Sequence, residues 1–150
     1  MLEIGTKAPE FALYDQDGHL HTLNNYLGRK IILYFYPKDQ TAGCTKEACS
    51  FRDRYPQFTE KGAVILGVSK DSVKSHKNFE EKQQLPFTLL SDPDHKVHEL
   101  YDVWVEKNMY GKKVKGTERS TYLIDEEGFI IKTYQKVKPA DHAEIVLQDL

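Results

Sequence analysis

Residues 31–49 read Ile31-Ile-Leu-Tyr-Phe-Tyr36-Pro37-Lys-Asp-Gln-Thr41-Ala-Gly-Cys44-Thr-Lys-Glu-Ala-Cys49. The apolar run over 31–36 predicts a buried strand, which ends at Pro37 because proline cannot donate to a strand ladder. A short turn follows, and the helix-favouring residues after it predict a helix over 43–60. Cys44 is therefore expected in the first turn of a helix that follows a buried strand.

The rest of the chain alternates between strand and helix patterns. An N-terminal β-hairpin is expected over 11–23, with its turn at Asp15-Gln-Asp-Gly18. The further expected elements are strands 31–36, 63–69, 87–90, 120–125 and 129–135, and helices 43–60, 72–83, 94–101 and 139–150. This order predicts an α/β protein of the thioredoxin-like kind, with a mixed central sheet flanked by helices in one domain over 1–150. The segment 105–117, which is rich in lysine, is expected to be a solvated loop.

Cys44 and Cys49 are the two cysteines of the chain. The first turn of a helix offers unpaired backbone N–H groups and the positive end of the helix dipole, which stabilise a thiolate. Because the thiolate is the nucleophilic form of cysteine, Cys44 is the candidate nucleophile.

The spacing of the two cysteines argues against a permanent disulfide. Five residues on a helix correspond to about 140° of rotation and a rise of ~7.5 Å, which separates the Cα atoms by ~8.6 Å. A disulfide requires a Cα separation of ~4.4–6.8 Å. The helix must therefore unwind locally before Cys49 can condense with a Cys44 sulfenic acid.

The stretch from Tyr34 to Cys49 resembles the active-site signature of the peroxiredoxins, Pro-x3-Thr-x2-Cys, and in particular the bacterioferritin comigratory protein (peroxiredoxin Q) subfamily. The resemblance extends to Gly5-x-x-Ala8-Pro9-x-Phe11 and to Arg119-Ser-Thr-Tyr-Leu-Ile-Asp125, so it covers nearly the whole chain. Ala42 departs from the family, which often has proline there, and this change is expected to loosen the turn slightly.

The resemblance implies a role for five residues. Cys44 would be the peroxidatic cysteine and Cys49 the resolving one, while the Thr41 hydroxyl would lie between the sulfur and a bound peroxide. Pro37 would shield the pocket from water, and Arg119 would stabilise the thiolate and orient the peroxide. Taken without the resemblance, Thr41 is equally well a helix N-cap, Pro37 a strand terminator and Arg119 an ordinary surface residue.

The resemblance also implies the reaction partners. The substrate would be hydrogen peroxide or an organic hydroperoxide, the reductant would be thioredoxin or a similar dithiol, and no haem, flavin or metal cofactor is needed. A monomer is favoured. The six histidines include His95-x2-His98, but no third close ligand accompanies that pair, so a metal site is disfavoured.

Charge and hydropathy limit the remaining classes of function. The net charge of −2 and the pI near 6.3 provide no basic field for nucleic acid or a membrane surface. The N-terminal residues do not form a signal sequence, and no apolar run approaches the ~18 residues that span a bilayer. A cytoplasmic protein is expected, and in that reducing compartment two close cysteines favour catalysis over a structural bridge.

Two other functions use the same cysteines. A thioredoxin-type disulfide oxidoreductase normally has Cys-x2-Cys, whereas four residues separate the cysteines here. An insulin-reduction assay distinguishes it from a peroxidase. A redox sensor would show oxidation of Cys44 that changes a partner surface, with negligible turnover in the presence of a reductant.

Overall fold

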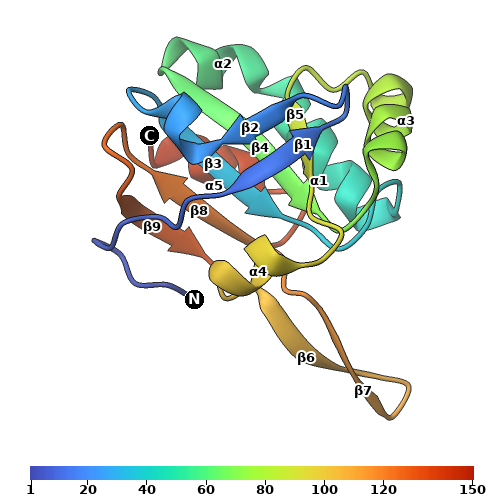
Figure 1. Cartoon of the computed structure of the whole chain (residues 1–150). Helices are drawn as coiled ribbons and strands as arrows, with labels where there is room; N and C mark the ends of the chain where they lie inside the picture. The colour runs from blue at the N-terminus through green and yellow to red at the C-terminus, as the bar shows by residue number, and fades with distance from the viewer.

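The computed structural model describes residues 1–150 and contains a seven-stranded mixed sheet with the strand order β2-β1-β5-β4-β3-β8-β9 (Figure 1). These strands are β1 (Ala12–Asp15), β2 (Leu20–Thr22), β3 (Lys30–Phe35), β4 (Ala63–Ser69), β5 (Thr88–Ser91), β8 (Ser120–Ile124) and β9 (Ile130–Tyr134). The helices are α1 (Ala42–Asp53), α2 (Tyr55–Glu60), α3 (Val73–Gln83), α4 (Lys96–Leu100) and α5 (His142–Gln148), with a 3-10 turn at Leu23–Tyr26. The predicted mixed sheet with flanking helices and an N-terminal hairpin is confirmed.

Strand β3 lies near the centre of the sheet, parallel to β4 and antiparallel to β8. Its odd-numbered side chains, Ile31, Leu33 and Phe35, enter one hydrophobic cluster, and its even-numbered ones enter a second cluster on the opposite face. Because both faces are buried, β3 appears in the sequence as a continuous apolar run without polar alternation.

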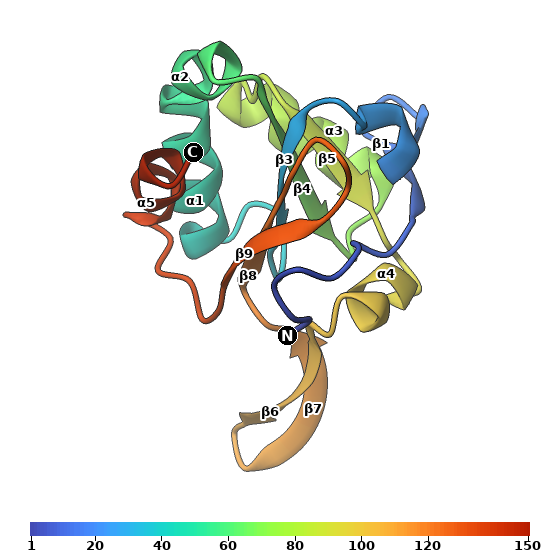
Figure 2. The same cartoon turned by 90° about the vertical axis from the view of Figure 1, so that its left-hand side faces the viewer.

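The helices divide between these two faces. Figure 2 shows α1 and α5 side by side on one face of the sheet, with α4 on the other. Phe51 of α1, Phe79 of α3 and Val146 of α5 belong to the cluster that contains the even-numbered residues of β3. This face is thus closed by the helix that carries both cysteines.

The predicted helix over 43–60 is wrong in one respect, because two helices occupy it. Helix α1 ends at Asp53, Arg54 leaves helical geometry with φ −108° and ψ 6°, and α2 begins at Tyr55. Pro56 explains the break: in a continuous helix its ring would clash with the carbonyl of Arg52, four residues earlier.

The predicted solvated loop over 105–117 is also wrong. Strands β6 (Trp104–Met109) and β7 (Lys112–Thr117) form a separate antiparallel hairpin that projects from the body of the molecule (Figures 1 and 2). Tyr110 and Gly111 connect them with φ values of 53° and 78°, the positive values that a tight two-residue hairpin turn requires. The lysine-rich composition concealed this pattern.

Gly67 of β4 permits the close packing of a buried tyrosine in the core. A Cβ added at Gly67 would lie 2.9 Å from both Cζ and Oη of Tyr34 and 3.0 Å from Cδ2 of Leu89. We expect Gly67→Ala to lower the free energy of unfolding by about 1–3 kcal/mol because the core is overpacked. Urea denaturation measures this, with Gly116→Ala as control, since an added Cβ there meets its nearest atom at 3.5 Å. Equal losses in the two variants would contradict the packing argument.

Candidate active site

Cys44 lies in the first turn of α1, directly beyond the end of β3, and only 2% of it is exposed. The helix begins after Thr41, whose backbone is extended (φ −77°, ψ 157°) and whose carbonyl accepts the Thr45 N–H at 2.9 Å. Three N–H groups of the first turn, including that of Cys44 itself, have no acceptor within the helix. The sulfur is thus held where the helix favours negative charge, as the sequence predicted.

Arg119 is the cation that contacts this sulfur. Its Nη2 donates to Cys44 Sγ at 3.2 Å, and its Nη1 donates to Glu47 Oε1 at 2.7 Å. Arg119 precedes β8, whose Ser120 is the register partner of Phe35 at the end of β3. The antiparallel pairing of β3 with β8 therefore brings together two residues that are 75 positions apart in the chain.

Glu47 completes this group and was not predicted from the sequence. Its side chain is 1% exposed, and Oε2 has no hydrogen-bond partner. Burial raises the pKa of Glu47 to about 7, and the Arg119 guanidinium opposes that rise. Glu47 follows Cys44 by three residues, so the helical period alone places both side chains on one face of α1.

Gly43 makes room for the guanidinium. A Cβ at this position would lie 3.3 Å from Arg119 Nη2, which is tighter than ordinary contact. An added Cβ would require the guanidinium to shift by a few tenths of an ångström. The glycine therefore serves close packing here, since its backbone φ is not in the left-handed region.

The structure places Thr41 and Pro37 in the loop before α1. The Thr41 hydroxyl donates to the Lys38 carbonyl at 2.9 Å, and its side chain makes no capping bond to the helix. Its oxygen therefore keeps its lone pairs free to accept from a ligand. Pro37 is partly buried and follows Tyr36, which is 1% exposed.

Asp39 fixes this loop through a buried network that the sequence did not reveal. Its carboxylate accepts from Tyr36 Oη at 2.6 Å, Ser75 Oγ at 2.8 Å and His76 Nδ1 at 2.7 Å. His76 Nε2 lies 3.0 Å from the Leu90 carbonyl oxygen, so both ring nitrogens lie beside acceptors. This buried hydrogen-bond network connects the loop before Cys44 to the first turn of α3.

Cys49 faces a different part of the protein. Its Sγ lies 3.5 Å from Gln83 Oε1, and Arg52 Nη1 donates to the Gln83 carbonyl at 2.7 Å. Both cysteines are free thiols, one directed at Arg119 and the other at the end of α3. Disulfide formation therefore requires α1 to unwind, in agreement with the spacing argument.

Comparison with known proteins identifies the family. Residues 4–133 match the model of the AhpC/TSA family. The chain is 56% identical to a putative peroxiredoxin bcp of Coxiella burnetii over 97% of each protein, and 52% identical to the peroxiredoxin Bcp of Bacillus subtilis over 99% of this chain and 95% of the relative. This chain is a peroxiredoxin of the AhpC/TSA family.

Solved structures support the same conclusion. The bacterioferritin comigratory protein of Xanthomonas campestris is 46% identical and superposes with a TM-score of 0.92 over 99% of this chain and 95% of its own. The peroxiredoxin Q of Xylella fastidiosa gives a TM-score of 0.94 at 40% identity, again over 99% and 95%. The predicted subfamily, thioredoxin-like fold and thiol peroxidase activity are confirmed.

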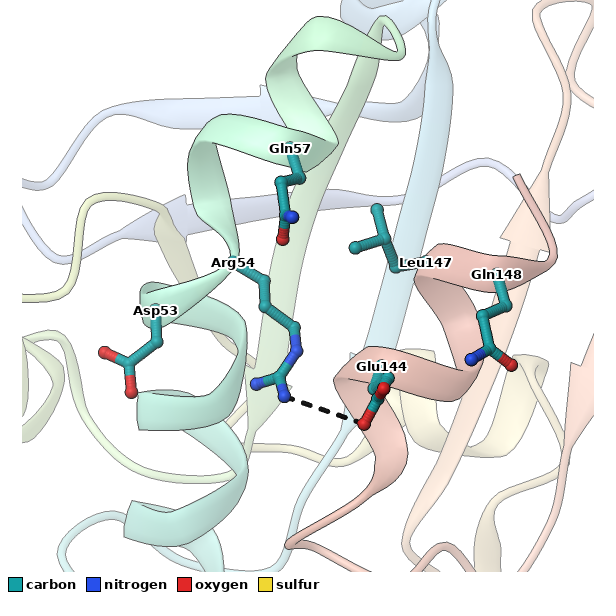
Figure 3. Close-up of a pocket in the computed structure, with 6 residues that line it drawn as sticks. All are labelled: Asp53, Arg54, Gln57, Glu144, Leu147 and Gln148. Atoms are coloured by element: carbon teal, nitrogen blue, oxygen red, sulfur yellow. Dashed lines mark ion pairs between the residues drawn. The ribbon is translucent and has the colours of Figure 1, made fainter.

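The largest surface cavity of the peroxiredoxin lies away from Cys44. It has a volume of about 620 Å³ and is open between α1, α2 and α5, where Arg54 Nη2 pairs with Glu144 Oε2 at 3.7 Å (Figure 3). Its lining is mainly polar and contains no cysteine.

No helix of the chain is both long and apolar enough to cross a membrane.

Glu47 gives the peroxiredoxin a specific dependence of stability on pH. Its folded pKa of about 7 exceeds the ordinary 4.5, so the folded state binds the proton more tightly than the unfolded state. The stabilisation of the folded state that comes from protonated Glu47 is fully present below about pH 4.5 and is lost as the pH rises through 7. Its magnitude is on the order of 3 kcal/mol. In a Cys44→Ser background, Glu47→Gln should therefore reduce the fall in unfolding free energy between pH 5 and pH 8.

Urea denaturation of the two proteins at both pH values measures this difference. The serine background removes ionisation of the Cys44 thiol, so the comparison isolates Glu47. The same fall in both proteins would show that Glu47 is ionised throughout this range.

Proposed function

We propose that Cys44 is the peroxidatic residue of this thiol peroxidase and Cys49 its resolving residue. The observation that carries the proposal is the 3.2 Å contact between Arg119 Nη2 and a cysteine sulfur in the first turn of a helix. Both the guanidinium and the helix end stabilise a thiolate, which is the form that attacks a peroxide. Cys49 has no comparable cation within hydrogen-bond distance of its sulfur.

The first step consumes one peroxide. The Cys44 thiolate attacks the nearer peroxide oxygen, the O–O bond breaks, and the departing oxygen takes a proton and leaves as water or an alcohol. Arg119 and the free N–H groups of the first turn stabilise the charge that develops on the oxygens. The Thr41 oxygen would accept from the peroxide O–H, and Pro37, which has no N–H, would border the pocket without competing for the substrate.

The second and third steps restore the enzyme. Cys49 attacks the Cys44 sulfenic acid, releasing water and forming a disulfide, after α1 unwinds locally. A dithiol protein of the thioredoxin type then reduces the disulfide by thiol exchange. We propose that these steps need no external cofactor, and that the enzyme acts as a monomer in the reducing cytoplasm.

The substrate class follows from the relatives and the setting of the sulfur. The solved structure from Xanthomonas campestris accompanies work on alkyl peroxide reduction by that protein. In this chain, Cys44 belongs to a buried cluster that includes Tyr34, Tyr36 and Phe51, so the sulfur has an apolar inner wall. We propose that organic hydroperoxides are reduced as well as hydrogen peroxide.

Intact mass spectrometry tests the two cysteine roles. After reduced protein is mixed with one equivalent of hydrogen peroxide and quenched with an alkylating reagent, the wild type should lose both alkylation sites. Cys49→Ser should oxidise Cys44 at the wild-type rate and then stall as the sulfenic acid, whereas Cys44→Ser should not consume peroxide. Loss of the first step in both variants would refute this division of roles, and an insulin-reduction assay would then test the oxidoreductase alternative.

The contacts of Cys49 should limit the second step. Arg52→Met removes the bond to the Gln83 carbonyl, whose net value is about 1 kcal/mol, so the unwound population should rise about fivefold. We expect disulfide formation to accelerate by a similar factor while the first oxidation keeps its rate, as measured by rapid quench and mass spectrometry. Lys82→Met, which removes an exposed charge from α3, is the control. An unchanged rate of disulfide formation in Arg52→Met would show that Arg52 does not restrain α1.

A further inference from the structure

The β6–β7 hairpin has two faces of different character. Directly paired residues of antiparallel strands share a face, so the register assigns every side chain to one side or the other. One face carries the pairs Glu106 with Lys115 and Asn108 with Lys113, and the other carries Lys107 with Val114 and Met109 with Lys112. We refer to the second group of four residues as the Met–Val face.

Each face carries a lysine without an ion-pair partner, but only the Met–Val face also exposes large apolar side chains. On the first face, Lys113 Nζ pairs with Glu106 Oε1 at 3.7 Å. On the Met–Val face, Met109 is 52% and Val114 39% exposed, and Lys112 forms no ion pair. Tyr110 at the tip is 99% exposed. Tyrosine and methionine are enriched in protein interfaces, and lysines at the rim of such a surface steer a partner of opposite charge.

The charge of the hairpin is opposite to that of the body. Residues 104–117 contain four lysines and one glutamate, which gives +3, so the remaining residues must carry −5 to reach the total of −2. A partner with a negative surface is therefore repelled by the body and attracted by the hairpin.

The inner end of the Met–Val face lies near Arg119 of the active site. Lys107 at its inner end donates to the Thr117 carbonyl, two residues before Arg119. Burial lowers the pKa of Lys107, and the nearby Arg119 cation adds to this effect while the Cys44 sulfur opposes it.

The base of the hairpin is held in position by the body. Trp104, the first residue of β6, stacks on His95 with ring centroids 4.2 Å apart, and Lys70 Nζ lies 5.2 Å from the indole centroid. These contacts come from the N-terminus of α4 and from the residue after β4. The hairpin is therefore directed by packed elements of the body, beside the site.

We propose that the Met–Val face is the docking surface for the dithiol protein that reduces the Cys44–Cys49 disulfide, and that this partner presents carboxylates around its dithiol. The inference rests on the proposed function, in which reduction of the disulfide is the step that requires a macromolecule, since peroxides are small. Met109, Val114 and Tyr110 supply apolar contact area, and Lys112 supplies the charge that steers and orients the acidic partner.

Neighbouring lysines on opposite faces provide a matched test. The assay measures peroxide turnover with a bacterial thioredoxin, thioredoxin reductase and NADPH, and in parallel with dithiothreitol as a small reductant. We expect Lys112→Glu to raise the KM for thioredoxin about fivefold or more and to weaken its dependence on salt. Lys113→Glu makes the same charge change on the other face and should stay within about twofold of the wild type. Turnover with dithiothreitol should be the same in all three proteins.

The other outcomes overturn the proposal in distinct ways. Equal effects of Lys112→Glu and Lys113→Glu on the KM for thioredoxin would show that the overall charge of the protein, and not the Met–Val face, determines binding of thioredoxin. A wild type that turns over with dithiothreitol but not with thioredoxin would refute docking of this partner, and absence of turnover with either reductant would refute the proposed function itself. A wild-type dimer in light scattering that Lys112→Glu converts to monomer would assign the face to a second copy of the chain.

Discussion

Arg119 donates one guanidinium nitrogen to Cys44 Sγ at 3.2 Å and another to Glu47 Oε1 at 2.7 Å. Two groups that can each carry a negative charge thus share one partly buried cation. Burial raises the pKa of Glu47 to about 7, against the effect of the guanidinium. A protonated Glu47 leaves the guanidinium charge to the sulfur, which is the arrangement that a nucleophilic thiolate requires. The site therefore depends on how burial divides one cation between two acids.

The sheet makes this contact possible. Strand β8 runs antiparallel to β3, and the last pair of this ladder is Phe35 with Ser120. Arg119, the residue before Ser120, therefore lies beside the loop that follows β3 and reaches the sulfur. The other side of that loop is tied to α3 by the Asp39–His76 pair. Buried polar atoms left without a hydrogen-bond partner are unfavourable, so removal of either residue would loosen the loop. Cys44 is thus positioned from the strand side by Arg119 and from the helix side by Asp39.

Local sequence patterns predicted the elements of the site but not its contacts. The apolar run before Pro37 and the helix-favouring residues after Gly43 placed Cys44 correctly, because periodicity and proline act over a few residues. Arg119 was found only through a family resemblance, since the 75 intervening residues carry no signal of β3–β8 pairing. Glu47 was missed because its burial depends on the sheet beneath α1. The hairpin over 104–117 was missed because lysine content was given more weight than the turn at Tyr110 and Gly111.

Helix α3 contacts both the loop before Cys44 and the side chain of Cys49. Its first turns bind Asp39 through Ser75 and His76, which are linked to the loop before Cys44, while its last residue contacts Cys49 and accepts a bond from Arg52. The two ends differ in strength: the first is a buried carboxylate that accepts several hydrogen bonds, and the second is one charge-assisted bond and one weak thiol contact. When α1 unwinds, the weaker end is expected to separate first, so Cys49 moves while the Cys44 loop stays attached to α3. A helix held firmly near the proposed nucleophile and loosely near the proposed resolving thiol would reconcile a preorganised first step with a second step that requires unfolding.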